Sequence, residues 1–272
     1  AVSYVGAKPV FADIDPGTFN LDPKSLARSL SSKTKAVIAV HIFGQCAALD
    51  EISKICRDKK LILIEDVAQA IGADYDSKRA GSWGEFGGFS FYPTKNLGAA
   101  GDAGLMTTRT EAHDKDLRSL RHHGSKQTYL HDREGWNSRL DEIQAAILRV
   151  KFRHLESFIE KRRKVAAGYR ARLAGSGVDL PVEHGRGRHV YHQFTIRSPR
   201  RDAIKEALAK DGIASSVFYP LSLHQQPVYA AANQGVSLPN SEAAAKTVLS
   251  LPINPTLDEA SLDRICKAVR AA

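Results

Sequence analysis

The sequence predicts an α/β protein with a mostly parallel sheet that has helices on both faces, followed by a smaller α+β domain. Apolar runs typical of buried parallel strands occur at Ala36–Phe43 and Leu61–Ile64, and Ala48–Lys59 between them has apolar residues at helical spacing. Beyond Gly175 the pattern changes, and Val190–Ile196 alternates like a strand of a half-solvated sheet. We therefore expect a large domain over residues 1–160 and a small domain over residues 161–272.

The composition is that of a soluble globular protein. The chain has 272 residues, 43% hydrophobic and 25% charged, enough for a sizeable core in one or two domains. The net charge of +9 fits nucleic acid, a membrane surface or small anions. Lysines and arginines cluster only at residues 161–164, which we interpret as a solvated helix face, so we expect an anionic nucleotide ligand and no nucleic acid.

Two further absences in the sequence bear on its location. No run approaches the roughly 18 apolar residues that span a membrane, so we expect no membrane association. The three cysteines, Cys46, Cys56 and Cys266, are too scattered for a disulfide framework or a zinc site. Such cysteine usage favours a reducing compartment, and we expect a cytoplasmic protein.

The remaining elements of the large domain follow from local patterns. The loop at Ser125–Trp136 is polar. The helix expected over Leu140–Leu155 has Ile143, Ala146, Ile147 and Val150 on one face, and continues toward Leu173 as a link between the domains. The other expected elements are strands at Val10–Asp15, Gly87–Tyr92 and Gly104–Thr108, and helices at Asp22–Leu30 and Glu111–Leu120.

In the small domain, Asp202–Lys210 has the pattern of a helix that Gly212 ends. A second strand is expected at Ser215–Tyr219. With Val190–Ile196, these elements give the α+β pattern.

The first candidate functional residue is Lys95, which follows the strand Gly87–Tyr92 within a glycine-rich loop. A loop lysine most often points to water. A partly desolvated lysine at a strand end is instead a nucleophile near neutral pH, and can form a Schiff base with pyridoxal phosphate.

Asp66 is the second candidate, because it stands at the carboxyl end of the strand that begins at Leu61. Ligands of open α/β sheets bind beyond the carboxyl ends of the strands, where an aspartate can pair with a protonated pyridine nitrogen. Capping of a following helix is an equally good interpretation. Gln69 is close enough in sequence to meet the same ligand, and the Ser90 hydroxyl could meet a phosphate.

Three other motifs are set aside. The glycine-rich segment at residues 81–88 lacks the G-x-G-x-x-G spacing of a dinucleotide site. His122 and His123 have no acidic or cysteine partner at ligand spacing, so we expect no metal. His41, at the end of a strand, is more typical of a hydrogen-bonded structural residue.

Three segments, in order, resemble one known family. EDVAQA, GSWGEFGGFSFYPTKNLGAAGDAG and WNSRLDEIQAAIL are similar to the pyridoxal-phosphate-dependent nucleotide-sugar aminotransferases of the DegT/DnrJ/StrS family, which have the type I aminotransferase fold. The resemblance runs from Pro9 to about Pro255. Val67 and Ala103 depart from the family pattern, but neither removes a reacting group.

The resemblance implies a role for each matching residue. Lys95 would carry the cofactor, Asp66 would bind its pyridine nitrogen, Gln69 its ring hydroxyl and Ser90 its phosphate. Asn137 would reach the phosphate of the cofactor in the other subunit, which implies a homodimer with a shared active site. Tyr219 and His224 match the segment that meets the sugar nucleotide, although packing of a turn explains them equally well.

The implied activity is transfer of an amino group, from glutamate, to a keto group of a nucleotide-linked sugar. Lys95 disfavours the alternative of a sugar dehydratase, since those relatives have histidine there. A non-catalytic nucleotide-sugar-binding relative is the other alternative. The family has a segment before Val10 with a Gly-Thr/Ser motif at a helix start, so we expect an N-terminally truncated chain. The sugar, and amination at carbon three or four, stay open, although the segment at residues 219–227 leans toward the 3-keto members.

Overall fold

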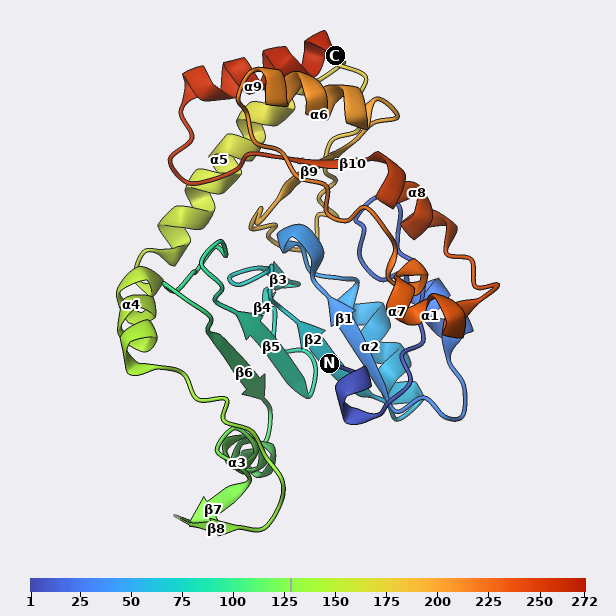
Figure 1. Ribbon diagram of the computed structural model, residues 1–272, viewed down its shortest axis with the longest axis vertical. Coiled ribbons are helices and arrows are strands. Elements are labelled where there is room, and N and C mark those ends of the chain that lie inside the picture. Colours follow the sequence, from blue (N-terminus) through green and yellow to red (C-terminus); the bar gives the residue numbers. More distant parts are fainter. Residues whose placement is uncertain (128) are drawn as a thin grey trace.

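A four-stranded sheet forms the centre of the larger part of the molecule (Figure 1). The computed structural model describes residues 1–127 and 129–272. The strand order is β1-β2-β5-β6, in which the first three strands are parallel and β6 is antiparallel to β5. The prediction of an α/β fold with a mostly parallel sheet is therefore confirmed. The strands are β1 (Ala36–Val40), β2 (Ile62–Asp66), β5 (Phe86–Ser90) and β6 (Gly104–Thr108).

Helices α1 (Pro23–Ser29) and α2 (Leu49–Asp58) cover one face of the sheet. Their buried side chains pack against alternate residues of β1 and β2, in a core formed by Leu26, Val37, Ala39, Ala47, Ile52, Cys56 and Leu63. The intervening residues of the same strands point to the opposite face. There Ile38, Val40 and Ile62 are 40–44% exposed.

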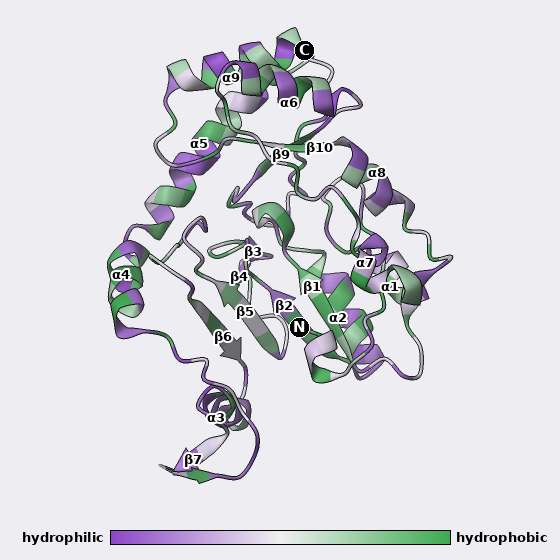
Figure 2. Cartoon of the chain, viewed as in Figure 1, coloured by the Kyte–Doolittle hydropathy of each residue, from purple (hydrophilic) through white to green (hydrophobic). Residues whose placement is uncertain are grey.

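A second core lies at the other end of the molecule (Figure 1). It is built on the antiparallel pair β9 (Phe194–Arg197) and β10 (Val248–Leu251). Helices α6 (Arg201–Lys210) and α9 (Glu259–Ala271) alternate between hydrophobic and hydrophilic residues along their length, as helices with one buried face do (Figure 2). The expected α+β architecture of this part is confirmed.

One long helix, α5 (Leu155–Leu173), joins the second core to a third cluster of buried residues. Its residues Leu155 and Ile159 pack in that third cluster, with Val67, Phe91 and Leu97, whereas Tyr169 and Leu173 pack in the second core. The expected domain boundary between residues 160 and 161 falls inside this helix and stays a prediction.

The expected single helix from Leu140 is wrong, because the chain breaks at Arg153 and His154. The first part is α4 (Glu142–Phe152). The solvated-face interpretation of residues 161–164 is wrong for Arg162, which is 7% exposed. Its Nη1 donates to the carbonyl oxygens of Tyr191 (3.1 Å) and Ile253 (3.0 Å), which explains its burial.

Five expected strands are absent or shorter among the described residues. Those at Ala36–Phe43 and Gly87–Tyr92 end early, at Val40 and Ser90. Val10–Asp15 is not a strand, because only Ile14 bridges Leu21 while the Asp13 carboxylate accepts backbone hydrogen bonds. Ser215–Tyr219 reduces to one bridge between Ser216 and Ser250. The alternating segment at residues 190–196 becomes a strand only from Phe194.

The segment between β6 and α4 projects from the sheet (Figure 1). It contains α3 (Glu111–Leu120), whose N-terminus is capped by the Thr110 hydroxyl accepting from His113 N at 3.2 Å. The expected loop at residues 125–136 is wrong in part, since β7 (Ser125–Gln127) and β8 (Leu130–His131) pair within it.

The remaining elements are short. They are hairpin β3 (Asp74–Tyr75) and β4 (Lys78–Arg79), helices α7 (Pro227–Ala230) and α8 (Pro239–Thr247), and the 3₁₀ turns η1 (Ser3–Val5), η2 (Ile42–Gly44), η3 (Leu223–Gln225) and η4 (Ala231–Asn233). Within residues 1–127 and 129–272, every helix is too short or too polar to cross a membrane.

Candidate active site

The candidate residues from the two central strands meet at one edge of the sheet. Strands β2 and β5 are parallel, with Asp66 opposite Gly88, so Asp66 and Ser90 lie at neighbouring carboxyl ends. Lys95 follows in a tight turn closed by a bond from its backbone N–H to Tyr92 O (2.9 Å). The topology thus brings together a carboxylate, a hydroxyl and an amine from three points in the sequence.

Lys95 is half-buried. Burial lowers the pKa of its amine, and the negative charge of Asp66 offsets only part of that effect. Asp66 accepts a hydrogen bond at Oδ1 from Ala68 N (2.9 Å) in a turn. Residues 67–70 are not helical, so the alternative interpretation of Asp66 as a helix cap is not supported.

Gln69 has a defined orientation. Its Oε1 accepts a hydrogen bond from Phe43 N at 2.6 Å, and its Nε2 donates to the Tyr219 hydroxyl at 3.4 Å. The carbonyl end of the side chain is therefore bound to the backbone of Phe43, and the amide NH₂ is the end that lies toward Tyr219, with a second N–H to donate. Gln69 and Tyr219, which lie 150 residues apart, are in contact.

Other candidates lie in different surroundings. The Ser90 hydroxyl accepts from Tyr92 N at 3.3 Å. Asn137 is exposed near the projecting segment, where its Oδ1 accepts from Arg139 Nε at 3.1 Å. His224 is 3% exposed and its Nε2 contacts Glu242 Oε1 at 3.1 Å, an arrangement that fits the packing alternative. In the part of the chain that the structure describes, neither Asn137 nor His224 hydrogen-bonds the residues around Lys95, and their roles stay predictions.

Helix α4 braces the Lys95 loop from the side. Gln144 Oε1 accepts from Ala100 N at 2.8 Å, and Lys151 Nζ donates to the carbonyl of Gly98. A side chain at position 98 would meet Pro93 O at 2.3 Å, so only glycine fits this tight loop. Sequence reasoning missed this brace because periodicity does not say which helix lies against which loop.

Sequence reasoning also missed His192, a 6% exposed residue in the segment packed against the lysine turn. Asn96 Nδ2 donates to Val190 O at 3.0 Å, which ties that segment to the neighbour of Lys95. Burial, followed by the charges of Lys95 and Arg162, lowers the pKa of His192 to about 3, so the imidazole is uncharged.

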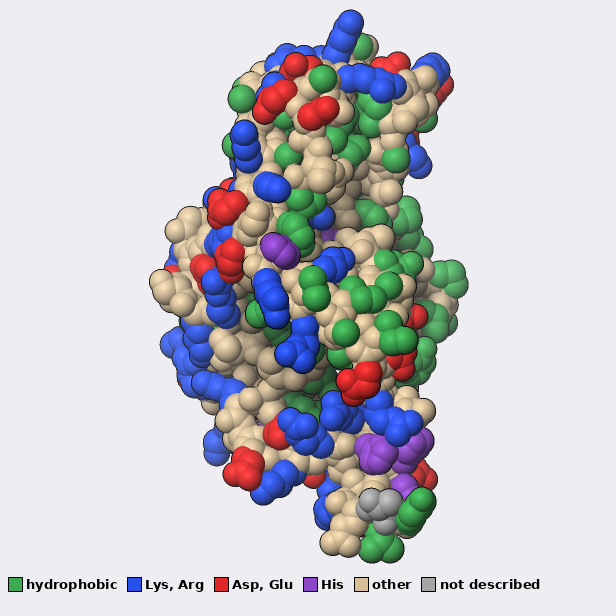
Figure 3. Space-filling view, turned by 90° about the vertical axis from the view of Figure 1, so that its left-hand side faces the viewer, with side chains coloured by type: hydrophobic (Ala, Val, Ile, Leu, Met, Phe, Trp, Pro, Cys, Tyr) green, Lys and Arg blue, Asp and Glu red, His purple; other side chains and the backbone are tan. Residues whose placement is uncertain are grey.

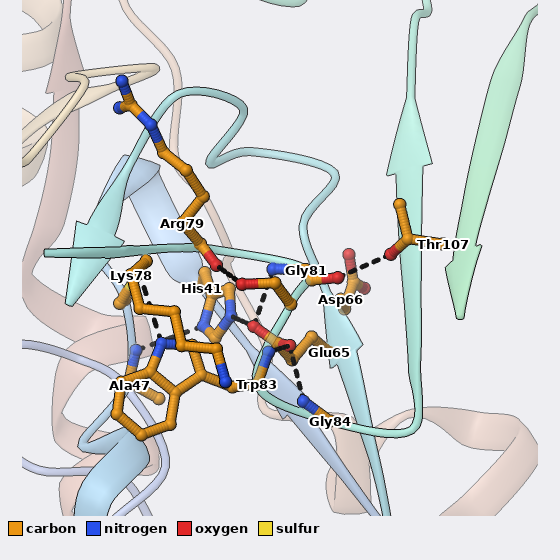
Figure 4. Close-up of polar contacts among 12 residues, drawn as sticks. His41, Ala47, Glu65, Asp66, Lys78, Arg79, Gly81, Trp83, Gly84 and Thr107 are labelled. Atoms are coloured by element: carbon orange, nitrogen blue, oxygen red, sulfur yellow. Dashed lines mark hydrogen bonds and ion pairs between the residues drawn. The ribbon is translucent and has the colours of Figure 1, made fainter. Parts of the chain in front are cut away.

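His41 is 0% exposed and hydrogen-bonds Glu65 and Ala47, which confirms the expectation of a hydrogen-bonded structural residue. Glu65, also 0% exposed, was assigned no role from the sequence. The glycine-rich segment at residues 81–84, which lacks the spacing of a dinucleotide site, binds the Glu65 carboxylate with its backbone amides (Figure 4). A glutamate at the end of an apolar run was the available signal. No cluster of three or more His, Cys, Asp or Glu placed to hold a metal exists in the described ranges.

Comparison with known proteins gives the family. The model of the DegT/DnrJ/EryC1/StrS aminotransferase family matches residues 1–270. The chain belongs to this family. The resemblance derived from the sequence motifs is thereby confirmed, together with the expectation of an aminotransferase.

Individual relatives within the DegT/DnrJ/EryC1/StrS family carry different names. The chain is 49% identical over 263 residues to a pleiotropic regulatory protein of Geobacillus stearothermophilus, covering 95% of this chain and 71% of the relative. It is 45% identical over 270 residues to a UDP-N-acetyl-3-dehydro-alpha-D-glucosamine 3-aminotransferase of Acidithiobacillus ferrooxidans, covering 99% and 73%.

Solved structures of the family agree. The fold matches DesV of S. venezuelae in complex with a ketimine intermediate with a TM-score of 0.96 and 40% identity, covering 99% of this chain and 73% of that one. NtdA from Bacillus subtilis with bound cofactor PMP matches with a TM-score of 0.90 and 30% identity, covering 98% and 63%.

Proposed function

We propose that this chain is a pyridoxal-phosphate-dependent aminotransferase that passes an amino group from glutamate to a keto group of a nucleotide-linked sugar. The observation that carries the proposal is the half-buried Lys95 at the carboxyl edge of the sheet, beside Asp66 and with a lowered pKa. A larger fraction of such an amine is unprotonated near neutral pH than of an exposed lysine. The names of the sugar aminotransferase relatives support the substrate class.

The residues at this edge fit the cofactor. Asp66 supplies a negative charge where a protonated ring nitrogen would need one, the NH₂ of Gln69 suits a ring oxygen, and Ser90 offers a hydroxyl to a phosphate. When bound, pyridoxal phosphate supplies a carbonyl that accepts the amino group and a conjugated ring that delocalises negative charge.

Lys95 supplies the proton transfers. When its amine is free and uncharged, Lys95 takes a proton from the α-carbon of the amino donor as a general base. As a general acid it then gives a proton to the bound cofactor. Asp66 has two effects here, because its charge favours a protonated pyridine nitrogen and also attracts the lysine ammonium. Tyr219, in contact with Gln69, is the residue we assign to the sugar side of the site.

We also propose a homodimer with a shared site. On α4, Ile143 is 74% and Val150 59% exposed, and both belong to the apolar face expected from the sequence. On the side of the molecule that carries α4, hydrophobic side chains lie at the surface among lysines and arginines (Figure 3). An unpartnered apolar helix face of this kind supports pairing with a second copy. The buried free cysteines support a cytoplasmic location.

The test compares the chain with Lys95→Ala. We expect the unaltered chain to bind pyridoxal phosphate covalently, in a form trapped by borohydride and seen in the visible absorption spectrum, and to aminate a UDP- or dTDP-linked 3-keto sugar with glutamate. Lys95→Ala should show neither the trapped form nor turnover. Steady-state turnover by this variant without added amine would refute the assignment, and Lys161→Ala, an exposed lysine elsewhere, is the control.

A further inference from the structure

A buried cluster of hydrogen-bonded groups lies next to the candidate site. It is centred on Glu65, the residue before Asp66. The Glu65 carboxylate accepts four hydrogen bonds, at Oε2 from His41 Nε2 (2.9 Å) and Gly81 N (2.7 Å), and at Oε1 from Trp83 N (2.6 Å) and Gly84 N (2.8 Å). Figure 4 shows these donors converging on the carboxylate. Each carboxylate oxygen of Glu65 thus accepts two hydrogen bonds, three in all from backbone amides and one from His41.

The charge of this carboxylate is stabilised where it lies. Burial alone would raise the pKa of Glu65, but the hydrogen bond from His41 and those from the amides of Gly84 and Gly81 hold it below its ordinary value. Glu65 is therefore a fixed anion.

The tautomer of His41 follows from its second contact. His41 Nδ1 lies 3.1 Å from Ala47 N, whose N–H donates to it. A nitrogen that accepts carries no proton, so the ring proton is on Nε2 and points to Glu65. Glu65 thereby selects the tautomer that leaves Nδ1 free to hold Ala47.

The bond from Ala47 to His41 closes the loop at residues 41–47, and that loop contacts the site. Phe43, within it, has a φ of 60° and donates its N–H to Gln69 Oε1 at 2.6 Å. A left-handed φ is unusual for a residue other than glycine, and here it turns the chain directly after the N–H that binds Gln69. The contact to Gln69 therefore depends on the path that this loop takes.

We propose that His41, anchored by Glu65, is a positioning residue for Gln69. Asn20 also binds this loop, at Ile42 N, Gln45 O and Cys46 O, and the backbone of residues 190 and 193 binds it at Gly44 and Phe43. His41 completes this set of contacts at Ala47, in the conformation in which Phe43 N–H binds the carbonyl end of Gln69 and leaves its NH₂ for the ligand. The inference rests on the proposed function for the identity of that ligand, but the contact between His41 and the loop does not.

Two substitutions separate the two bonds of His41. Asparagine places its side-chain oxygen near the position of Nδ1, so His41→Asn keeps an acceptor for Ala47 N–H and loses the bond to Glu65. Glutamine reaches the position of Nε2, so His41→Gln keeps a donor for Glu65 and loses the acceptor for Ala47.

The first measurement is amide hydrogen exchange of Phe43 in the chain without cofactor. His41→Gln should speed exchange of this amide about tenfold or more, whereas His41→Asn should stay within about threefold of the unaltered chain. Unchanged Phe43 protection in His41→Gln would overturn the inference. This readout does not depend on the cofactor, so a chain that fails to bind it refutes the proposed function alone.

The second measurement is the dissociation constant of pyridoxamine 5′-phosphate, which binds without covalent attachment. His41→Gln and Gln69→Ala should each weaken binding about tenfold, and the double variant should bind no more weakly than Gln69→Ala, because both act through one contact. Independent, multiplied losses would contradict the inference. Leu208→Ala, a 0% exposed residue of the second core, should lower the melting temperature and leave this affinity unchanged.

If His41→Gln does not fold, the tautomer of His41 in the unaltered chain tests the inference instead. Nitrogen-15 NMR of the histidine rings should show His41 protonated at Nε2 and accepting at Nδ1. A proton on Nδ1 would break the bond to Ala47 and overturn the inference.

Discussion

The surroundings of Lys95 determine how much of its amine is uncharged at neutral pH. Its amine is half-buried beside one carboxylate, and the uncharged His192 adds no positive charge nearby. Burial lowers the lysine pKa while Asp66 raises it, so the fraction of uncharged amine at neutral pH depends on the balance between the two. Substitution of Asp66 shifts that balance in a known direction.

Asp66→Asn should lower the pKa of Lys95 further, since it removes the Asp66 charge that raises this pKa while the burial that lowers it persists. The pH midpoint for modification of Lys95 by an amine-reactive reagent, in the chain without cofactor, should therefore fall. Turnover should fall by orders of magnitude, because the ring nitrogen loses its partner. Near-normal rates would refute the pyridinium role, and exposed Asp102→Asn should change neither quantity.

At the scale of elements, the sequence predicted strands from their apolar runs, although every second residue of β1 is exposed. The apolar runs of β1 and β2 were found because both strands are central or covered, whereas Val10–Asp15 alternates like a strand but uses the Asp13 carboxylate for backbone bonds to α8. The break between α4 and α5 was missed because the apolar spacing runs through it. Motifs in the sequence identified Lys95, Asp66 and Gln69 as site residues. The contact between His41 and Glu65 could not be predicted, because their other hydrogen-bond partners come from separate segments, at residue 47 and at residues 81–84.

Helix α4 should influence the Lys95 loop through one side chain. Gln144→Ala removes the acceptor of Ala100 N–H, so that amide should exchange several-fold faster, as expected for a net loss of about 1 kcal/mol. Gln144→Glu keeps an acceptor oxygen and should behave like the unaltered chain. Equal exchange in the alanine and glutamate variants would show that this contact does not hold the loop.

At the scale of the whole molecule, the proposed dimer would bury the exposed apolar residues of α4 against a second copy. If Asn137 serves the site of the other subunit, Lys95→Ala and Asn137→Ala are defects in different halves of one site. A mixed dimer then contains one intact site.

Mixing the two inactive variants should therefore restore about a quarter of the unaltered activity after subunit exchange, because half of the dimers are mixed and each has one good site. Val150→Glu, placed on the apolar face of α4, should prevent this rescue and give a monomer by sedimentation. Ala203→Glu, at an exposed position of α6, should leave rescue intact. No rescue from variants that do form dimers would mean that each subunit completes its own site.

Helix α5 links the stability of two hydrophobic cores, because it contributes buried residues to both. Leu155 and Ile159 at one end and Tyr169 and Leu173 at the other are fully or almost fully buried in different cores, yet they share one uninterrupted set of helical hydrogen bonds. Loss of either core exposes half of this helix and removes the packing that stabilises the other half. We therefore expect the second core and the cluster around the Lys95 loop to unfold together in one thermal transition.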